Sequence, residues 1–310
     1  MLRSRVLDLK LDRSSAPPKD AATIVLVRSA AVATGGIEIF CVERSKQSRF
    51  LGGAIVFPGG KLDASDASSE WASLATDARD PARAGSTVPF TSDGAHLHAL
   101  AIAACRETLE EAAMLHVAGG SKDVTQDVTQ DDLFALRAHL VSEPGALRSF
   151  LSERGLRLDL QALHPLARWV TPEAEARRYD ARFFVAVAPP GQTGAHDEHE
   201  TMASFWATPA EILRRWEAGE VQVAPPTHCT IALLASCATT DAVLELAAAS
   251  CLDPICPRLV RVPSPTEDQP ETLALTLPGD PEHEVPERRV PGPSRYVLRG
   301  DRWLAEDAPR

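Results

Sequence analysis

Residues 106–111, RETLEE, concentrate three glutamates and one arginine within a mostly apolar stretch. A helix over residues 97–116 would hold the carboxylates of Glu107, Glu110 and Glu111 within one arc of roughly 100°, because successive helical residues turn by about 100°. Apolar residues cover the other sides of this helix, which is typical of an element buried between layers. The stretch therefore predicts three partly buried carboxylates on one helix face.

These carboxylates have two interpretations. On an exposed face, repulsion between Glu107 and Glu111 costs only about 0.2–0.5 kcal/mol. In a partly buried site, carboxylates need positive charge nearby, and Arg106 supplies only one such charge. Carboxylate oxygens are preferred ligands of Mg²⁺ and other hard cations. The apolar flanks favour the second interpretation, a site for Mg²⁺ or Mn²⁺.

A pair of glycines lies upstream, in the sequence FPGGKLD. Gly59 and Gly60 follow a short apolar strand that ends at Pro58, so a plain turn would explain them. Adjacent glycines also let the backbone approach a ligand closely, and their carbonyls can face a cation.

Together the two segments resemble the Nudix box of the Nudix hydrolase superfamily. That box has a glycine, five residues, a glutamate, seven residues, and then Arg-Glu-apolar-x-Glu-Glu-x-Gly-apolar. Gly60 matches its start, and its second half is matched by Arg106, Glu107, Glu110, Glu111 and Met114. The sequence departs from the box at three positions: Asp66 replaces a glutamate, Thr108 an apolar residue and Ala113 a glycine.

Two further features resemble the members of this superfamily that hydrolyse coenzyme A. One is the insertion between Asp66 and the helix. The other is a pattern of Arg44, Ser45, three residues, Arg49, three residues and Gly53 ahead of FPGG. Arginine side chains suit phosphate oxygens, although ordinary surface charge would also explain them. The resemblance implies that substrate is bound by Arg44, Arg49 and Gly60.

The resemblance also implies roles in metal binding and catalysis. The metal ligands would be Gly59, through its carbonyl, and Glu107, Glu110 and Glu111. Glu107 or Glu200 would orient or deprotonate water, while Arg106 would pair with a glutamate of the box and hold its conformation. Glu200 belongs to an acidic stretch in which Asp197 and Glu198 are alternative candidates. An ordinary acidic surface loop explains that stretch equally well.

The reaction implied is metal-dependent hydrolysis of a nucleoside diphosphate linked to another group. Coenzyme A or acyl-coenzyme A is the first expectation, with 3′,5′-ADP and (acyl-)phosphopantetheine as products. Two alternatives stay open: a Nudix pyrophosphatase for ADP-ribose or a dinucleotide, and a non-catalytic Nudix module that senses a nucleotide. The carboxylate set favours an enzyme, while Asp66 and Ala113 keep the sensing module open.

The elements around the box alternate irregularly between strands and helices, which favours one α/β domain with insertions. Strands are expected over residues 22–30, 37–45 and 177–190, and short strands over 272–277 and 294–304. Helices are expected within residues 131–164, after Thr208 as N-cap, and over 227–250. With the resemblance, this implies a Nudix-type α/β/α sandwich around a mixed sheet, with a helical insertion and a small C-terminal β appendage.

The expected domain organisation has three parts. Residues 1–20 form a flexible N-terminal segment, and residues 21–250 form the Nudix domain, with insertions at about 64–95 and 117–165. Residues 251–310 form a Pro-rich extension with short strands.

Composition limits the partners. The net charge of −11 argues against a broad nucleic-acid surface but allows a small phosphorylated substrate, given a cation or a few local arginines. Six scattered cysteines without a C-x-x-C pair indicate reduced thiols and a cytoplasmic protein. No apolar run is long enough for a membrane span. The expected partner is a small nucleotide diphosphate, without nucleic acid or membrane, and a homodimer stays open.

Overall fold

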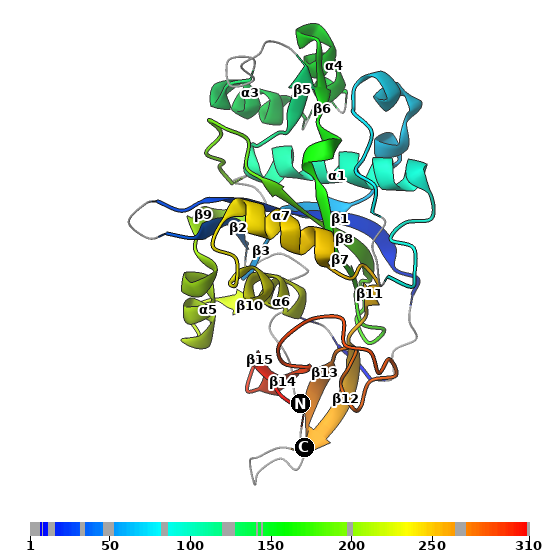
Figure 1. Ribbon diagram of the computed structural model, residues 1–310, viewed down its shortest axis with the longest axis vertical. Coiled ribbons are helices and arrows are strands. Elements are labelled where there is room, and N and C mark those ends of the chain that lie inside the picture. Colours follow the sequence, from blue (N-terminus) through cyan, green and yellow to red (C-terminus); the bar gives the residue numbers. More distant parts are fainter. Residues whose placement is uncertain are drawn as a thin grey trace.

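The structure is a computed structural model that describes residues 7, 9–11, 16–31, 35–45, 53–81, 86–119, 128–140, 142–143, 145–196, 201–263 and 271–308. Within these ranges, nine strands form one mixed sheet, whose main path runs β10-β3-β2-β1-β8-β7-β11 (Figure 1). The remaining two strands lie off this path, because β4 pairs with β1 and β9 with β2. The expected α/β fold around a mixed sheet is confirmed.

The strands of this sheet are β1 (Lys19–Ser29), β2 (Ile37–Arg44), β3 (Ala54–Val56), β4 (Gly59–Lys61), β7 (His164–Val170), β8 (Tyr179–Val187), β9 (Thr201–Ala207), β10 (Gln222–Val223) and β11 (Pro254–Ile255). β1 and β2 are antiparallel, as their hairpin-like sequence predicts, whereas β1 and β8 are parallel over nine residue pairs from Lys19–Tyr179 to Val27–Val187.

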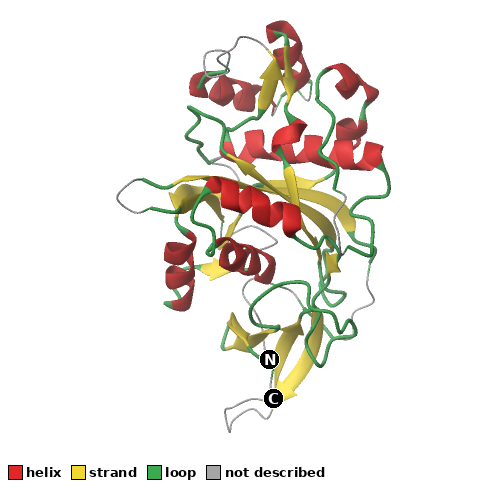
Figure 2. Cartoon of the chain, in the orientation of Figure 1, coloured by secondary structure: helices red, strands yellow, loops and turns green. Residues whose placement is uncertain are grey.

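Alternation along β1 feeds two separate cores, one on each face of the sheet. Ile24 and Leu26 pack with the apolar side chains of α1 (Gly94–Ala112), whereas Val25 and Val27 pack on the opposite face. The second face is covered by α5 (Pro209–Glu217), α6 (Pro225–Leu234) and α7 (Thr240–Ala249). Figure 2 shows these helices on the side of the sheet opposite α1, so the expected α/β/α layers are present.

The segment between the halves of the box, predicted as a surface insertion, contributes to the core as well. It forms two short 3₁₀ helices, η1 (Ala64–Ala67) and η2 (Ser69–Ser73). Trp71 and Phe90 from this segment are buried against α1 in the first core. A second excursion from the domain carries β5 (Val117–Gly119), α3 (Gln130–Leu140), α4 (Ala146–Arg154), β6 (Leu156–Leu158) and η3 (Leu160–Ala162).

The C-terminal residues form the small β appendage that the sequence predicts. Four antiparallel strands follow in order: β12 (Arg258–Pro263), β13 (Glu271–Thr276), β14 (Arg295–Arg299) and β15 (Arg302–Glu306). Leu275, Tyr296 and Trp303 from these strands belong to the second core of the main domain. The appendage is therefore packed against the domain through buried side chains.

Three local expectations differ from the structure. The helix expected over residues 97–116 runs from Gly94 to Ala112, and the single helical segment expected over 227–250 is two helices, α6 and α7. The glycine pair lies in strand β4 and not in a plain turn, since Gly59 and Gly60 pair with Thr23 and Ala22 of β1.

All six cysteines are free thiols.

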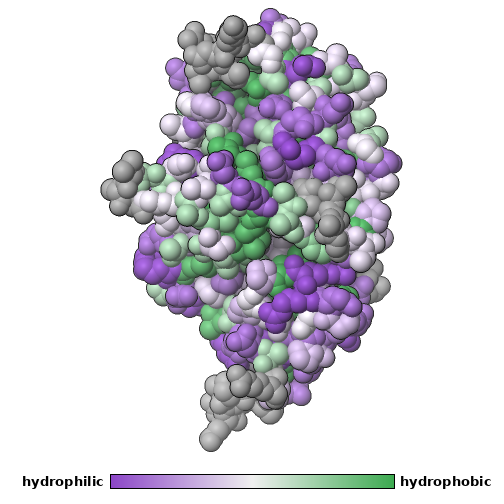
Figure 3. Space-filling view, viewed as in Figure 1, coloured by the Kyte–Doolittle hydropathy of each residue, from purple (hydrophilic) through white to green (hydrophobic). Residues whose placement is uncertain are grey.

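The face shown in Figure 3 is mostly polar, with an apolar band near its middle. Among the described residues, the large hydrophobic side chains that are exposed are Leu11, Val88, Phe134 and Val187. In this same part of the chain, no helix is both long and apolar enough to cross a membrane.

Candidate active site

Helix α1 presents the three glutamates, and its two ends are fixed by specific contacts. Asp93 caps the N-terminus, where its side chain accepts a hydrogen bond from the backbone N–H of His96 at 2.8 Å. The C-terminus ends at Ala113, which adopts a left-handed conformation with φ of 49°. Glycine usually occupies such a position because a side chain there is strained. Ala113 thus keeps the backbone shape of the glycine that it replaces.

Arg106 joins the two halves of the box. Its Nε and Nη2 donate to the two carboxylate oxygens of Asp66, 40 positions earlier, at 2.9 and 3.0 Å. Nη1 donates to Glu107 Oε1 at 2.8 Å and to Glu110 Oε1 at 3.3 Å, and Nη2 also donates to the carbonyl of Lys61. The expected pairing of Arg106 with glutamates of the box is present, and buried Asp66 is an additional partner.

Glu111 fixes the glycine strand against α1. Its Oε2 accepts a hydrogen bond from the backbone N–H of Gly59 at 3.0 Å, and its Oε1 lies 3.8 Å from Nη1 of Arg44. A Cβ atom on Gly60 would lie 2.4 Å from Glu107 Oε1, and one on Gly59 would lie 2.5 Å from the carbonyl oxygen of Ala22. Gly59 is therefore required for the close approach of β4 to β1, and a side chain at Gly60 would displace the carboxylate of Glu107.

The electrostatics of the cluster show a shortage of positive charge. Burial raises the pKa of Glu107 to about 7, against the opposing effect of Arg106. Burial also raises the pKa of Glu110, which Arg106 again lowers in part. Glu111 is 6% exposed. A nearby cation would restore the ionised form of these carboxyl groups.

A hard divalent cation is bound mainly by oxygen ligands such as carboxylates. Among the described residues, no three His, Cys, Asp or Glu side chains already stand in a metal-binding arrangement. The chemistry of the donors nevertheless fits Mg²⁺ or Mn²⁺, because Glu107, Glu110 and Glu111 line one cavity, are partly or fully buried, and together with Asp66 outnumber the guanidinium groups of Arg106 and Arg44 that contact them.

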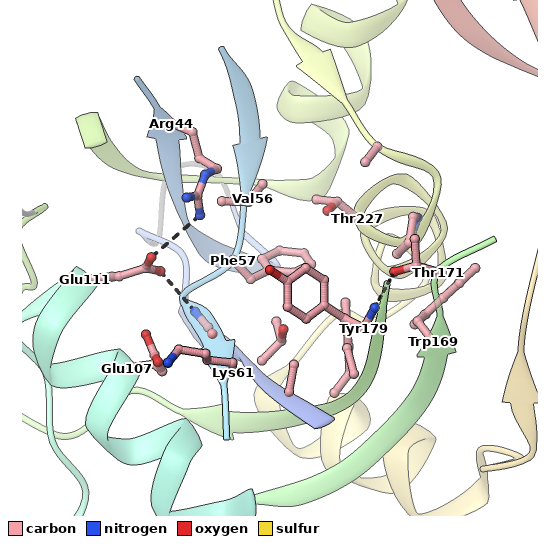
Figure 4. A pocket seen from close by; sticks show the side chains of 18 of the residues that line it. Arg44, Val56, Phe57, Lys61, Glu107, Glu111, Trp169, Thr171, Tyr179 and Thr227 are labelled. Carbon is pink, nitrogen blue, oxygen red and sulfur yellow. Dashed lines mark hydrogen bonds and ion pairs between the residues drawn. The ribbon is translucent and has the colours of Figure 1, made fainter. Parts of the chain in front are cut away.

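The cavity that holds this cluster has a volume of about 1520 Å³. Figure 4 shows Glu107 and Glu111 on one side of it, facing Arg44 and the glycine strand, while Trp169 and Tyr179 lie on the other side. The polar part can hold phosphates and a cation, and the remainder is large enough for a further substituent.

Sequence reasoning located the polar part of this site and missed its far walls. Phe57, Trp169, Tyr179 and Phe183 line the cavity, as do Phe134 and Arg137 of α3 in the second insertion. Phe57 belongs to the FPGG segment, but no local motif marks the others, because they reach the cavity only through the packing of distant strands and of α3. Two expected site residues, Arg49 and Glu200, and the alternatives Asp197 and Glu198, lie outside the described residues.

The fold and the carboxylate helix are those of a Nudix domain. A crystal structure of a NUDIX hydrolase from Alicyclobacillus acidocaldarius is similar, with a TM-score of 0.57 and 30% sequence identity over 74% of this chain and 96% of the other. Residues 18–234 match the family model of the NUDT19 Nudix domain, so the chain belongs to that family.

Curated relatives agree with this assignment. The chain is 30% identical to the acyl-coenzyme A diphosphatase NUDT19 of Gallus gallus over 61% of its own length, and 26% identical to the Xenopus laevis protein of the same name over 80%. The matched regions span 58% of the Gallus gallus protein and 71% of the Xenopus laevis protein.

Proposed function

We propose that this chain is a diphosphatase that requires a divalent cation and hydrolyses coenzyme A or acyl-coenzyme A to 3′,5′-ADP and (acyl-)phosphopantetheine. The observation that carries the proposal is the carboxylate cluster of α1, which Arg106 and Glu111 join to the glycine strand inside one large cavity. The names of the curated relatives support the choice of substrate.

The cation is Mg²⁺ or Mn²⁺, held by the carboxylates of Glu107, Glu110 and Glu111 and by the carbonyl of Gly59. When bound, it supplies neutralisation of phosphate charge and a lowered pKa for bound water.

The protein groups hold and orient the reactants. Glu107, which lines the cavity within the carboxylate cluster, orients or deprotonates water. Glu200 is the alternative base. Arg106 positions Glu107 and Glu110 through its hydrogen bonds. Arg44, which lies beside Glu111 at the cavity wall, and Arg49 bind phosphate oxygens, and Gly60 leaves room for the substrate.

The first test is a substrate panel of coenzyme A, acyl-coenzyme A, ADP-ribose and a dinucleotide, each assayed with Mg²⁺ and with Mn²⁺. The proposal predicts the highest kcat/KM for a coenzyme A substrate. Equal or higher efficiency on ADP-ribose or a dinucleotide would replace the proposed substrate. Binding of a nucleotide without any turnover would support a sensing module instead.

The second test is Glu110→Gln. We expect kcat to fall by about 100-fold or more with the fold retained, since even changes behind a metal ligand cost 10- to 100-fold. Glu153→Gln, at an exposed position of α4, is the matched control and should keep full activity. Unchanged turnover in Glu110→Gln would remove this carboxylate from the ligand set.

A cytoplasmic location and a homodimer remain parts of this proposal. Sedimentation equilibrium of the purified protein would test the dimer, and a single species with the mass of one chain would contradict it.

A further inference from the structure

A part of the cavity away from the carboxylates has apolar walls and no role in the hydrolysis itself. Its described walls include a set that we call the apolar arm: Phe57, Trp169, Ala181, Phe183, Pro225 and Leu275. Figure 4 shows Trp169 on the opposite side of the cavity from Glu107 and Glu111, with Phe57 between them. A diphosphate held at the glutamates would leave this arm to another part of the substrate.

The walls of the arm come from segments far apart in the sequence but linked by direct contacts. Trp169 of β7 is the register partner of Ala181 of β8. The rings of Phe57 and Phe183 meet edge to face, with centroids 6.4 Å apart. Phe183 stands two residues after Ala181 and so points to the same face of the sheet.

The C-terminal appendage supplies one of these walls. Leu275 of β13 lines the cavity, and its register partner in β14 is Tyr296. The hydroxyl of Tyr296 lies 3.5 Å from the carbonyl of Pro225, which begins α6 and also lines the arm. The appendage is thus packed against the start of α6 where both line the arm.

The chemistry of the arm favours a flexible apolar chain over a nucleobase. Recognition of a base requires hydrogen bonds to its edge as well as stacking. The hydroxyl-bearing side chains Thr171, Tyr179 and Thr227 line the same cavity but lie outside the set of six that forms the arm. The walls themselves are aromatic, proline and aliphatic side chains.

We propose that the apolar arm binds the acyl group of acyl-coenzyme A, and that the C-terminal appendage, through Leu275, limits the length of the chain that is accepted. This inference rests on the proposed diphosphatase activity and adds to it a selectivity site. The acyl group is joined to the diphosphate through the pantetheine unit. An acyl site must therefore share a cavity with the carboxylates yet lie away from them, as the arm does.

The test fills the arm from a half-buried position. Ala181→Leu adds side-chain volume to a wall without removing a core residue. We expect the ratio of kcat/KM for dodecanoyl-coenzyme A to kcat/KM for free coenzyme A to fall at least about tenfold, since single methylenes in apolar pockets change selectivity by 10- to 200-fold.

The matched control is Ala305→Leu in β15. Ala305 is a half-buried alanine of the same core that does not line the cavity, so this ratio should stay within about twofold of wild type, as expected where no pocket contact changes. If the arm holds the adenine ring instead, Ala181→Leu lowers both kcat/KM values equally, and the unchanged ratio overturns the inference.

A second variant, Leu275→Ala, opens the wall that the appendage provides. The expected result is a higher ratio of kcat/KM for hexadecanoyl- over dodecanoyl-coenzyme A than in wild type, and an unchanged ratio would remove Leu275 as the limit. If this variant fails to fold, Leu275→Val makes the same comparison of chain lengths with a smaller loss of core volume. Failure of wild type to hydrolyse any coenzyme A substrate would reject the proposed function itself, which is a different result.

Discussion

The side chain of Arg106 connects two segments that are distant in the sequence, because it binds Asp66. Its guanidinium contacts Asp66 with two nitrogens and also contacts Glu107, Glu110 and a backbone carbonyl. A lysine has a single point of charge and cannot reproduce this fork. The shape of the side chain therefore matters as much as its charge.

We predict that Arg106→Lys lowers the free energy of unfolding by about 2 kcal/mol, because buried Asp66 loses at least one of its donors. The kcat of the variant should fall by roughly 10- to 100-fold as the glutamates lose their orientation. Urea unfolding and turnover assays would measure both. Arg214→Lys is the control, since Arg214 also forms paired contacts with a glutamate, Glu211, but on an exposed surface. Equal effects in the two variants would contradict this role of Arg106.

The conformation of Ala113 predicts a substitution that raises, and does not lower, the free energy of unfolding. Its φ of 49° is unfavourable for any residue with a Cβ atom, by roughly 1–2 kcal/mol. Ala113→Gly should therefore raise the free energy of unfolding by about 1 kcal/mol, after subtraction of the backbone entropy that glycine adds to the unfolded chain. Thermal and urea unfolding would show it. A loss of stability would mean that packing of the Ala113 methyl group, which is fully buried, outweighs the strain.

At the scale of elements, the sequence predicted those whose signals are local. The carboxylate helix, the β1–β2 hairpin and the cap of α5 at Thr208 follow from periodicity and capping, and each is present. The break between α6 and α7 was missed because residues 227–250 carry no glycine or proline, although Thr239, the N-cap of α7, is a local signal for it. The strand character of Gly59 and Gly60 depends on pairing with β1, which no local pattern encodes.

The same limit applies to the site. The spacing of the box brought together Glu107, Glu110, Glu111 and the glycine pair, and the structure places them in one cavity. The ion pair between Asp66 and Arg106 spans 40 positions, and the contact between Leu275 and the arm depends on how the appendage packs. Contacts of this kind are fixed by tertiary packing, so a single sequence holds no periodic signal for them.

The junction between α6 and the appendage contains a titratable group. His228 is 7% exposed, packs against Trp216 with ring centroids 4.0 Å apart, and has its Nδ1 2.8 Å from the hydroxyl of Tyr296. Burial lowers the pKa of His228 to about 4. In the unfolded chain a histidine has a pKa of about 6.5. As the pH falls from about 6.5 to about 4, the unfolded chain takes up a proton that the folded chain does not.

This difference destabilises the fold by up to roughly 3 kcal/mol over that pH range, and the stability is fully present above it. We predict that His228→Gln has a flatter stability curve between pH 4 and 7 than wild type. Urea unfolding at each pH would measure the two slopes. Carboxylates and the buried His116 titrate in both proteins, so only the difference between the two stability curves is attributed to His228. Parallel curves would show that His228 is not buried as described.

At the scale of the whole molecule, the appendage and the domain share one core. Tyr296, Leu298 and Trp303 are at most 4% exposed and pack in the same cluster as Val25 and Ile39 of the central sheet. Removing the appendage would uncover this apolar surface. The expected division at residue 251 therefore describes the chain order, while the packing joins the two parts.

We predict that backbone amides in β13 and β14 exchange with solvent as slowly as those in β1 and β8. The reason is that opening the appendage alone would expose core residues of both parts. Hydrogen–deuterium exchange followed by mass spectrometry would compare the peptides. The edge strand β15 should exchange faster and serves as an internal control. Much weaker protection of β13 would identify the appendage as a separately opening unit.

The ion pair between Asp66 and Arg106 also determines how much the length of the first insertion matters to the site. The two ends of the first insertion are held by this pair and by the pairing of β4 with β1, independently of the chain between them. The entropy of closing such a loop grows only with the logarithm of its length, so each doubling costs about 0.6 kcal/mol. The geometry of the carboxylate site therefore depends little on the number of residues inserted between the two halves of the box. The segment is free to lengthen or shorten wherever it does not carry a buried residue such as Trp71 or Phe90.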